Sequence, residues 1–201
     1  EHSILAEETG QDSNISDYLW VIDPLDGTTN FVHGYPSYAV SIGLFYKNAP
    51  LIGVVLEMPN MKLYTAIKDQ GAWCEGEKIE SSNTKNIKRS LLVTGFGYEH
   101  GENWEKNMRL FKCLTDDTQG VRRLGAAAID ICHVAKGYVD GFWEYDLKPW
   151  DTAAGILIAK EAGCMITDLS GDRFDINDNN ILITNGHIHQ DMVNSIERYL
   201  N

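Results

Sequence analysis

The residue types best suited to chemistry occur in the stretch Asp23-Pro24-Leu25-Asp26-Gly27-Thr28-Thr29, which has two acidic residues three positions apart. Gly27 and Thr28 follow them with small side chains and accessible backbone N–H groups. Carboxylates coordinate hard cations such as Mg²⁺, and the N–H groups at the start of a helix bind anions. Together these residue types predict cations that hold a phosphate group beside a set of backbone amides. An ordinary turn is the competing interpretation, which so many special residues in one short stretch disfavour.

Other carboxylates that could join this motif lie far from it in the sequence. Glu7 and Glu8 follow an apolar run, and Asp151 stands in the expected first turn of a helix that begins at Pro149. Taken alone, Glu7-Glu8 is more typical of a solvated loop, and Asp151 of a carboxylate favoured by the helix dipole. Joined to the motif, they predict magnesium, which prefers oxygen ligands. Two such ions can clamp the attacking and leaving oxygens of a phosphate if they share one carboxylate.

The elements expected to position the first carboxylates form an antiparallel meander. The apolar run 18–22 predicts a buried strand, which Pro24 is expected to end because proline has no N–H group. The segment 38–46 is rich in β-branched and aromatic residues and predicts the next strand. Further strands are expected at 51–56, 63–67, 71–74 and 78–79. A short helix is expected to start at Gly27.

The pattern changes after the polar segment 81–85, where strands and helices alternate. Such alternation predicts an α/β part with a parallel or mixed sheet. Strands are expected at 91–94, 138–143, 165–167 and 181–184, and helices at 104–114, 125–136, 149–162 and 192–200. We therefore expect two parts, residues 1–85 and 86–201, that form one compact catalytic unit.

Composition limits the classes of partner. The net charge of -12 argues against nonspecific binding to nucleic acids and acidic membranes. No apolar run approaches the roughly 20 residues of a membrane span, and no signal peptide is visible. The four cysteines are scattered and are interpreted as reduced thiols of a cytoplasmic protein. The chain begins at Glu1 and runs at once into apolar residues, so an amino-terminal segment is expected to be missing.

Four segments resemble one family of phosphatases. Residues Asp23 to Phe31 and Trp150 to Gly155 resemble the two signatures of the inositol monophosphatase family, which belongs to the magnesium-dependent, lithium-sensitive phosphatases. Leu5 to Thr9 resembles its acidic pair, and Gly120 to Ala128 its substrate-side turn. The matches run in family order along essentially the whole chain. The resemblance implies an α/β (α+β) fold, a layered αβαβα sandwich of the sugar-phosphatase type, here without the family's amino-terminal helical segment.

The resemblance also implies a set of ligands for two to three Mg²⁺ ions. Glu7, Asp23 and the carbonyl of Leu25 would hold the first ion. Asp23, Asp26 and Asp151 would hold the second, which makes Asp23 the shared carboxylate. A third and weaker ion would again use Glu7.

The remaining implied roles concern the phosphate, the attacking water and the alcohol. The backbone N–H groups of Gly27 and Thr28 would bind the phosphate, and Thr28 would orient the water together with Glu7 and a metal ion. Five residues would face the alcohol portion of the substrate: Asp26, Gly125, Ala127, Glu144 and Asp151. For Glu144, an exposed position at the end of a strand is an equally weighted alternative.

The implied reaction is hydrolysis of a small polyol phosphate such as myo-inositol 1-phosphate by a homodimer. Histidinol phosphate, fructose 1,6-bisphosphate and 3′-phosphonucleotides are rival substrates. From another class, some bacterial members of the family bind the transcription machinery, so a non-catalytic binding partner is the second hypothesis.

Two smaller expectations concern charged side chains. Arg122 and Arg123 either attract phosphate or, by preference, pair with nearby acids, and His187 and His189 are expected to be solvated.

Overall fold

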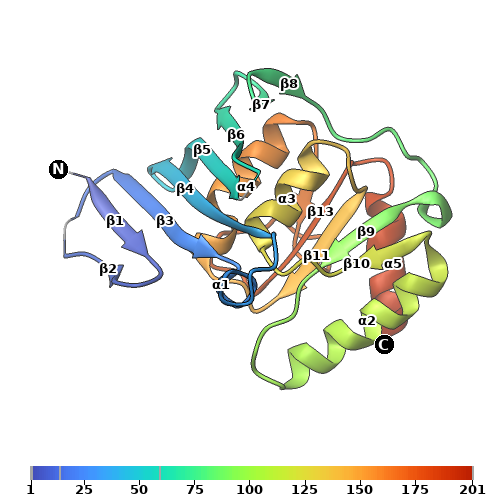
Figure 1. Cartoon of the computed structure of the whole chain (residues 1–201). Helices are drawn as coiled ribbons and strands as arrows, with labels where there is room; N and C mark the ends of the chain where they lie inside the picture. Colours follow the sequence, from blue (N-terminus) through green and yellow to red (C-terminus); the bar gives the residue numbers. More distant parts are fainter. Residues whose placement is uncertain (1, 14, 59, 201) are drawn as a thin grey trace.

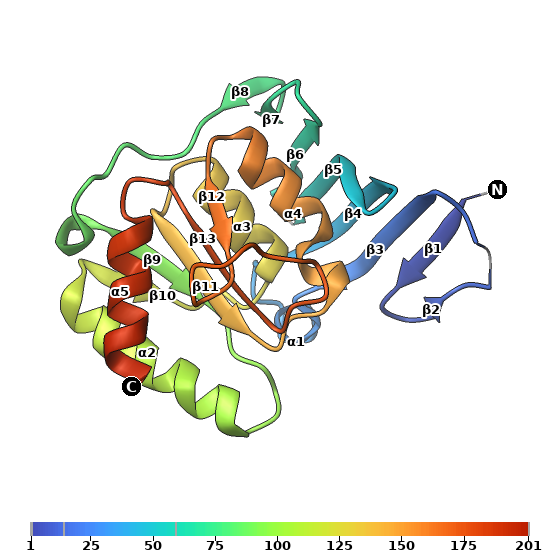
Figure 2. The ribbon, with the colours of Figure 1, turned by 180° about the vertical axis from the view of Figure 1, so that it is seen from behind.

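The structure, a computed structural model, describes residues 2–13, 15–58 and 60–200 and contains two sheets with helices between them (Figure 1). The larger sheet has the strand order β2-β1-β3-β4-β5-β6-β7-β8, and the smaller one β10-β9-β11-β13-β12. Helices α3 (Ala127–Ala135) and α4 (Pro149–Glu161) fill the space between the sheets. Helices α2 (Glu102–Asp117) and α5 (His189–Leu200) cover the far face of the smaller sheet (Figure 2). The described residues thus confirm the predicted mixed, layered α/β architecture.

The larger sheet is the predicted meander with two additional strands at one edge. All its pairings are antiparallel except that of β1 with β3. Sequence patterns missed β1 and β2 because they are too short to show a period. The strands are β1 (Ser3–Ala6), β2 (Gly10–Gln11), β3 (Tyr18–Asp26), β4 (Tyr38–Tyr46), β5 (Ala49–Met58), β6 (Lys62–Ile67), β7 (Ala72–Cys74) and β8 (Glu77–Ile79).

Strand β3 does not end at Pro24 as expected. Asp23 pairs with Ser41 and Asp26 with Ala39, so β3 has one residue more than β4 across this interval. Such an extra residue is a β-bulge, where a proline without an N–H group is tolerated. In a regular strand, residues three apart would point to opposite faces. The extra residue in the bulge shifts the alternation of side chains between the two faces by one position, and the carboxylates of Asp23 and Asp26 line the same pocket.

The smaller sheet is mixed, as predicted. β9 runs parallel to β10 and β11, whereas β13 runs antiparallel to β11 and β12. Its strands are β9 (Leu91–Thr94), β10 (Gly120–Arg122), β11 (Gly141–Tyr145), β12 (Met165–Thr167) and β13 (Asn180–Thr184). The short helix α1 (Thr28–Val32) follows β3, and a 3₁₀ turn (Ile87–Arg89) precedes β9.

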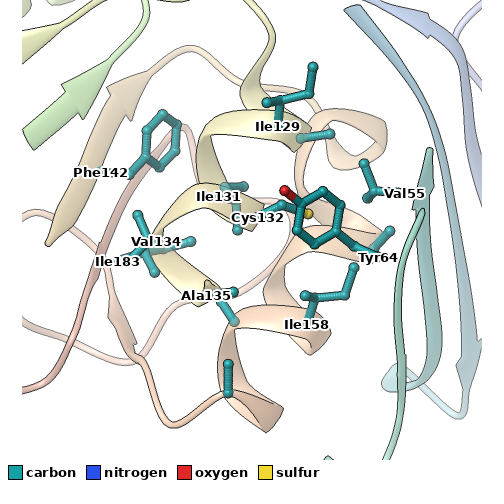
Figure 3. Close-up of a cluster of buried hydrophobic side chains, with 14 of the residues drawn as sticks. Val55, Tyr64, Ile129, Ile131, Cys132, Val134, Ala135, Phe142, Ile158 and Ile183 are labelled. Atoms are coloured by element: carbon teal, nitrogen blue, oxygen red, sulfur yellow. The ribbon is translucent and has the colours of Figure 1, made fainter. Parts of the chain in front are cut away.

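Helix α3 is buried on nearly all sides because both sheets and α4 pack around it. On the side of the larger sheet, α3 presents Ile129 and Cys132, which lie close to Tyr64 of β6 (Figure 3). Phe142 of β11 lies on the side of the smaller sheet. Helix α4 fits closely because Gly53 leaves it room. A Cβ atom at Gly53 would lie 2.5 Å from the carbonyl oxygen of Ala154. This packing fixes the start of α4, which carries Asp151.

Three further expectations can be compared with the structure. All four cysteines are free thiols, as predicted. His189 is only 5% exposed and lies between the hydroxyl oxygens of Thr167 and Thr184, at 3.0 and 2.9 Å, so its predicted solvation is wrong. His187 is exposed as expected. Among the described residues, none of the helices combines the length and the apolar character that a membrane crossing requires.

Candidate active site

A cavity of about 1030 Å³ opens where the ends of β3 and β11 meet the starts of α1, α3 and α4. The cavity is lined by every residue to which the resemblance assigns a metal, phosphate, water or alcohol role: Glu7, Asp23, Leu25, Asp26, Gly27, Thr28, Gly125, Ala127, Glu144 and Asp151. They come from segments of both sheets that are distant in sequence. The fold therefore brings the four resembling segments together around one space.

The acidic residues reach the cavity through different elements. β1 runs parallel to β3 with Ala6 beside Ile22, and the N–H of Glu7 donates to the carbonyl of Ile22 at 3.2 Å. Glu7 therefore stands level with Asp23 at the same end of the sheet. Asp151 arrives on the first turn of α4 and accepts a hydrogen bond of 2.6 Å from the N–H of Lys148.

Burial and mutual repulsion make this group of carboxylates costly to ionise without cations. Burial raises the pKa of Asp23 to about 7, and the charges of Glu7 and Asp151 add to the rise. Burial likewise raises the pKa of Asp151 to about 6. For Asp26, burial followed by the charges of Asp23 and Asp151 raises the pKa well above its usual value. A bound divalent cation would reverse these shifts, because it favours the ionised form.

Asp26 also has a structural role that sequence reasoning missed. Its two carboxylate oxygens accept hydrogen bonds from the N–H groups of Ala127 and Ala128, at 3.2 and 2.7 Å. The N–H groups in the first turn of a helix have no partner within the helix itself, and those of Ala127 and Ala128 lie in the first turn of α3. The carboxylate therefore ties the end of β3 to α3. Ala127 is expected to face the alcohol portion of the substrate, and its N–H already has Asp26 as a partner.

The turn between β3 and α1 requires glycine. Gly27 has a φ of +86°, and a Cβ atom there would lie 2.9 Å from the carbonyl oxygen of Ser37 and 3.1 Å from that of Gly125. Its neighbour Thr28 donates its hydroxyl hydrogen to the carbonyl of Leu25 at 3.0 Å. The proposed water-orienting residue and the proposed carbonyl ligand are therefore in direct contact.

Glu144 is buried, with 7% of its surface exposed, so the alternative of an exposed strand end is wrong. Burial, then the charges of Asp151 and Asp26, raise its pKa well above the usual value, and Arg123 opposes them. Its carboxylate lies against Gly95, where a Cβ atom would come within 2.3 Å of both oxygens.

Part of the cavity wall was not anticipated from the sequence. The segment 95–101, which joins β9 to α2, contributes Tyr98, whose hydroxyl lies 3.0 Å from that of Thr29 in α1. In the first turn of α2, the side-chain amide of Asn103 donates to Asp146 at 2.7 Å. Glycines and an aromatic residue directly after a strand were the available signal, but such residues also occur in ordinary loops.

The donor set suits hard cations. It combines carboxylates with the Leu25 carbonyl, and these oxygen ligands are the type that Mg²⁺ and Ca²⁺ prefer. Within the part of the chain that the structure describes, no group of three or more His, Cys, Asp or Glu side chains already has the arrangement of a metal centre.

Comparison with known proteins points to one family. The sequence model described as "Inositol monophosphatase family" matches residues 1–200. Phosphatase IMPL1, chloroplastic, from Arabidopsis thaliana is 51% identical over 98% of this chain, which spans 55% of that relative. Nus factor SuhB from Pseudomonas aeruginosa is 38% identical over 99% of this chain and 75% of its own length. The solved inositol monophosphatase from Anabaena (Nostoc) matches with a TM-score of 0.92 at 41% identity, covering 99% of this chain and 79% of that chain.

Proposed function

Because the chain belongs to the inositol monophosphatase family, we propose that it is a magnesium-dependent phosphomonoesterase acting on a small polyol phosphate. The supporting observation is the convergence of Glu7, Asp23, Asp26 and Asp151 on one cavity beside the Gly27–Thr28 turn. Myo-inositol 1-phosphate is the first substrate to test. Histidinol phosphate, fructose 1,6-bisphosphate and 3′-phosphonucleotides remain the rivals.

The proposed ligands are those implied by the resemblance. Glu7, Asp23 and the Leu25 carbonyl would hold one Mg²⁺, and Asp23, Asp26 and Asp151 a second; Glu7 would also serve a third. When bound, such ions neutralise phosphate charge and make water easier to deprotonate near neutral pH. The raised pKa values of Asp23 and Asp151 support this assignment, since they mark buried negative charge that lacks compensation.

The other steps belong to the chain's own groups. The N–H groups of Gly27 and Thr28 would hold the phosphate oxygens as charge develops on them. The Thr28 hydroxyl and Glu7 would orient the attacking water, which converts a bimolecular encounter into a positioned reaction. Gly125, Ala127 and Glu144 would line the space for the alcohol. No covalent intermediate on the protein is required.

The proposal is tested by phosphate release from a panel of the four substrate types, with and without Mg²⁺. Asp23→Asn should lower kcat/KM by at least about a hundredfold, because it removes charge from the shared ligand. Asp191→Asn is the matched control, since Asp191 is exposed in the first turn of α5. Undiminished phosphate release by the Asp23 variant would contradict the proposed site.

The size and assembly of the working enzyme are also proposals. We expect residues 1–85 and 86–201 to act as one catalytic unit, because the cavity takes its lining from both. We expect a homodimer, as the resemblance implies, and a cytoplasmic location, as the scattered cysteines indicate. Light scattering would give the oligomeric state, and a mass equal to one chain of 22.5 kDa would contradict it.

A second candidate function rests on the relative named Nus factor SuhB. The chain could serve as a binding partner of the transcription machinery, through protein contacts rather than direct nucleic-acid binding, given its net charge of -12. A pull-down with Asp23→Asn separates the two functions. Retained partner binding without hydrolysis would support an independent binding role, and capture of no transcription protein would remove it.

A further inference from the structure

Helix α2 turns one polar side chain toward the protein interior. Its buried residues are Asn107, Leu110 and Leu114, which share one face of the helix. Asn107 is only 2% exposed, and among the described residues its Oδ1 atom has no hydrogen-bond partner. An unpaired buried acceptor costs stability, so the packing of α2 alone does not account for an asparagine at this position.

The amide nitrogen of Asn107 contacts the segment that follows β9. Its Nδ2 atom donates to the carbonyl of Gly95 at 2.5 Å, and Gly95 comes directly after the last residue of β9, Thr94. The hydroxyl of Thr94 donates to the carbonyl of Trp143 in β11, also at 2.5 Å. These two bonds tie the backbone at Gly95 to α2 on one side and to β11 on the other, at the residue directly before Glu144.

Glu144 takes its place in the cavity from this backbone. A Cβ atom at Gly95 would lie 2.3 Å from both carboxylate oxygens of Glu144, so the carboxylate fills the space that any side chain at Gly95 would need. Within the described ranges of the chain, no hydrogen bond holds this carboxylate. Packing against Gly95 therefore positions it, and a displacement of the Gly95 backbone moves the surface on which it lies.

A second asparagine of α2 holds the other side of Glu144. Asn103, one turn before Asn107, donates to the carboxylate of Asp146 at 2.7 Å, and Asp146 lies two residues after Glu144. Helix α2 itself covers the face of the smaller sheet that is turned away from α3 and α4 (Figure 2). The outer helix thus contacts both flanks of a carboxylate that lines the cavity.

We propose that Asn107 is a positioning residue for the carboxylate of Glu144, and that it determines from the outer helix layer how firmly the site holds the alcohol portion of its substrate. The inference rests on the proposed phosphomonoesterase function and adds a residue that acts without touching the substrate, since Gly95 and Glu144 line the described cavity and Asn107 does not. Asn107 fixes Gly95, Gly95 fixes the carboxylate, and the carboxylate accepts hydrogen bonds from the hydroxyl groups of the polyol.

Two substrates isolate the effect, because only one has hydroxyl groups on its leaving alcohol. Myo-inositol 1-phosphate carries a ring of them, whereas 4-nitrophenyl phosphate offers none to Glu144. Asn107→Leu removes the donor at similar volume and should raise KM for inositol 1-phosphate about threefold to tenfold, the range of one hydrogen bond, with kcat within about twofold. Both constants for 4-nitrophenyl phosphate should change less than about twofold. Asn107→Ala, which leaves space instead of filling it, should give the same pattern.

A double variant tests whether Asn107 acts through Glu144. In a Glu144→Ala chain, Asn107→Leu should raise KM no further, because the carboxylate that it positions is gone. Leu114→Val is the control, since Leu114 is fully buried on the same face of α2 and its truncation loosens the helix without removing a bond to Gly95. This control should leave the ratio of the two KM values unchanged. Urea midpoints check that each variant folds.

A rise in KM that is confined to inositol 1-phosphate and disappears in the Glu144→Ala chain supports the inference. Equal changes for both substrates, additive losses in the double variant or the same shift in Leu114→Val would overturn it, because each is the result of a general loosening of α2. If Asn107→Leu does not fold, Asn107→Ala decides by the same comparisons. If the wild-type chain did not hydrolyse inositol 1-phosphate, the proposed substrate would fail, and the inference with it.

Discussion

Replacing Gly27 with alanine should destabilise the protein by more than its backbone conformation alone can explain. Gly27 has a φ of +86°, and the left-handed region costs a residue with a Cβ atom about 1 to 2 kcal/mol. The new Cβ atom would also lie 2.9 Å from the Ser37 carbonyl oxygen and 3.1 Å from that of Gly125. Relief of these contacts requires a backbone shift, for which overpacking costs of about 1 to 3 kcal/mol are typical.

Gly34 provides the matched control. It lies just beyond α1 with a φ of +67°, and a Cβ atom there would meet nothing within 4 Å. Gly34→Ala therefore carries the conformational cost alone, about 1 to 2 kcal/mol. Gly27→Ala carries both costs, so we expect about 2 to 5 kcal/mol. The difference between the two variants measures how tightly the turn packs against Ser37 and Gly125.

Urea unfolding of the two variants, with equal m-values required, gives the comparison. The activity assay adds a second reading, because the shift at Gly27 moves the proposed phosphate site against the Gly125 turn. Gly27→Ala should lower kcat, whereas Gly34→Ala should leave it within about twofold of wild type. Equal losses of unfolding free energy would refute the close-approach reasoning, and full activity of Gly27→Ala would refute the link to the site.

Three further predictions test other parts of the molecule. The hydrogen bond with His133, followed by that residue's charge and Lys62, lowers the pKa of Glu57 to about 2 against the effect of burial. A lowered folded-state pKa gives stability that is present above about pH 4.5 and is lost as the pH falls toward about 2. The advantage of wild type over Glu57→Gln in urea titrations, up to about 3 kcal/mol, should therefore shrink as the pH falls through that window. Mg²⁺ should raise the midpoint of thermal unfolding because it binds the folded chain, and EDTA should reverse that rise. Asp23→Asn should abolish most of the rise. An equal rise in the Asp23→Asn variant would contradict the ligand assignment. Tyr98→Phe should raise KM about two- to fivefold with unchanged stability. Thr29→Val in the same chain should raise KM no further, because both changes remove the same hydrogen bond; additive effects on KM would show that the two hydroxyls act independently.

Periodicity and turn chemistry predicted most elements because their physical causes are local. Strand β4 and helix α4 follow from β-branched runs and from a proline at the first helical position. The bulge in β3 could not be predicted, because a proline after an apolar run ends a strand unless the neighbouring strand tolerates an extra residue. His189 illustrates the same limit: its burial depends on hydroxyls from β12 and β13, which sequence spacing does not place.

For the candidate site, sequence identified residue types and the resemblance assembled them, but neither indicated their mutual contacts. Asp26 accepts hydrogen bonds from two N–H groups of α3. This contact depends on how a strand of one sheet meets a helix packed against the other sheet. Tyr98 was missed as a wall residue for a related reason, and Arg123 was weighed as a residue that attracts phosphate but was assigned by preference to pairing with a nearby acid. An exposed arginine or tyrosine in a turn is usually solvated, and only the tertiary fold shows which of them faces the cavity.

The contacts between the two halves of the site divide its functions. The β3–α1 turn meets the turn before α3 through Asp26, through the close approach of Gly27 to Gly125, and through the side-chain amide of Asn30, which donates to the Leu124 carbonyl at 2.8 Å. These contacts fix the proposed phosphate position relative to the start of the alcohol pocket, so substitutions there should impair every substrate alike. Arg123 and Tyr98 make few contacts of this kind and are exposed. Changes at these two positions can therefore alter which alcohol is accepted while leaving the proposed metal and phosphate positions in place, and differences in substrate preference should concentrate there.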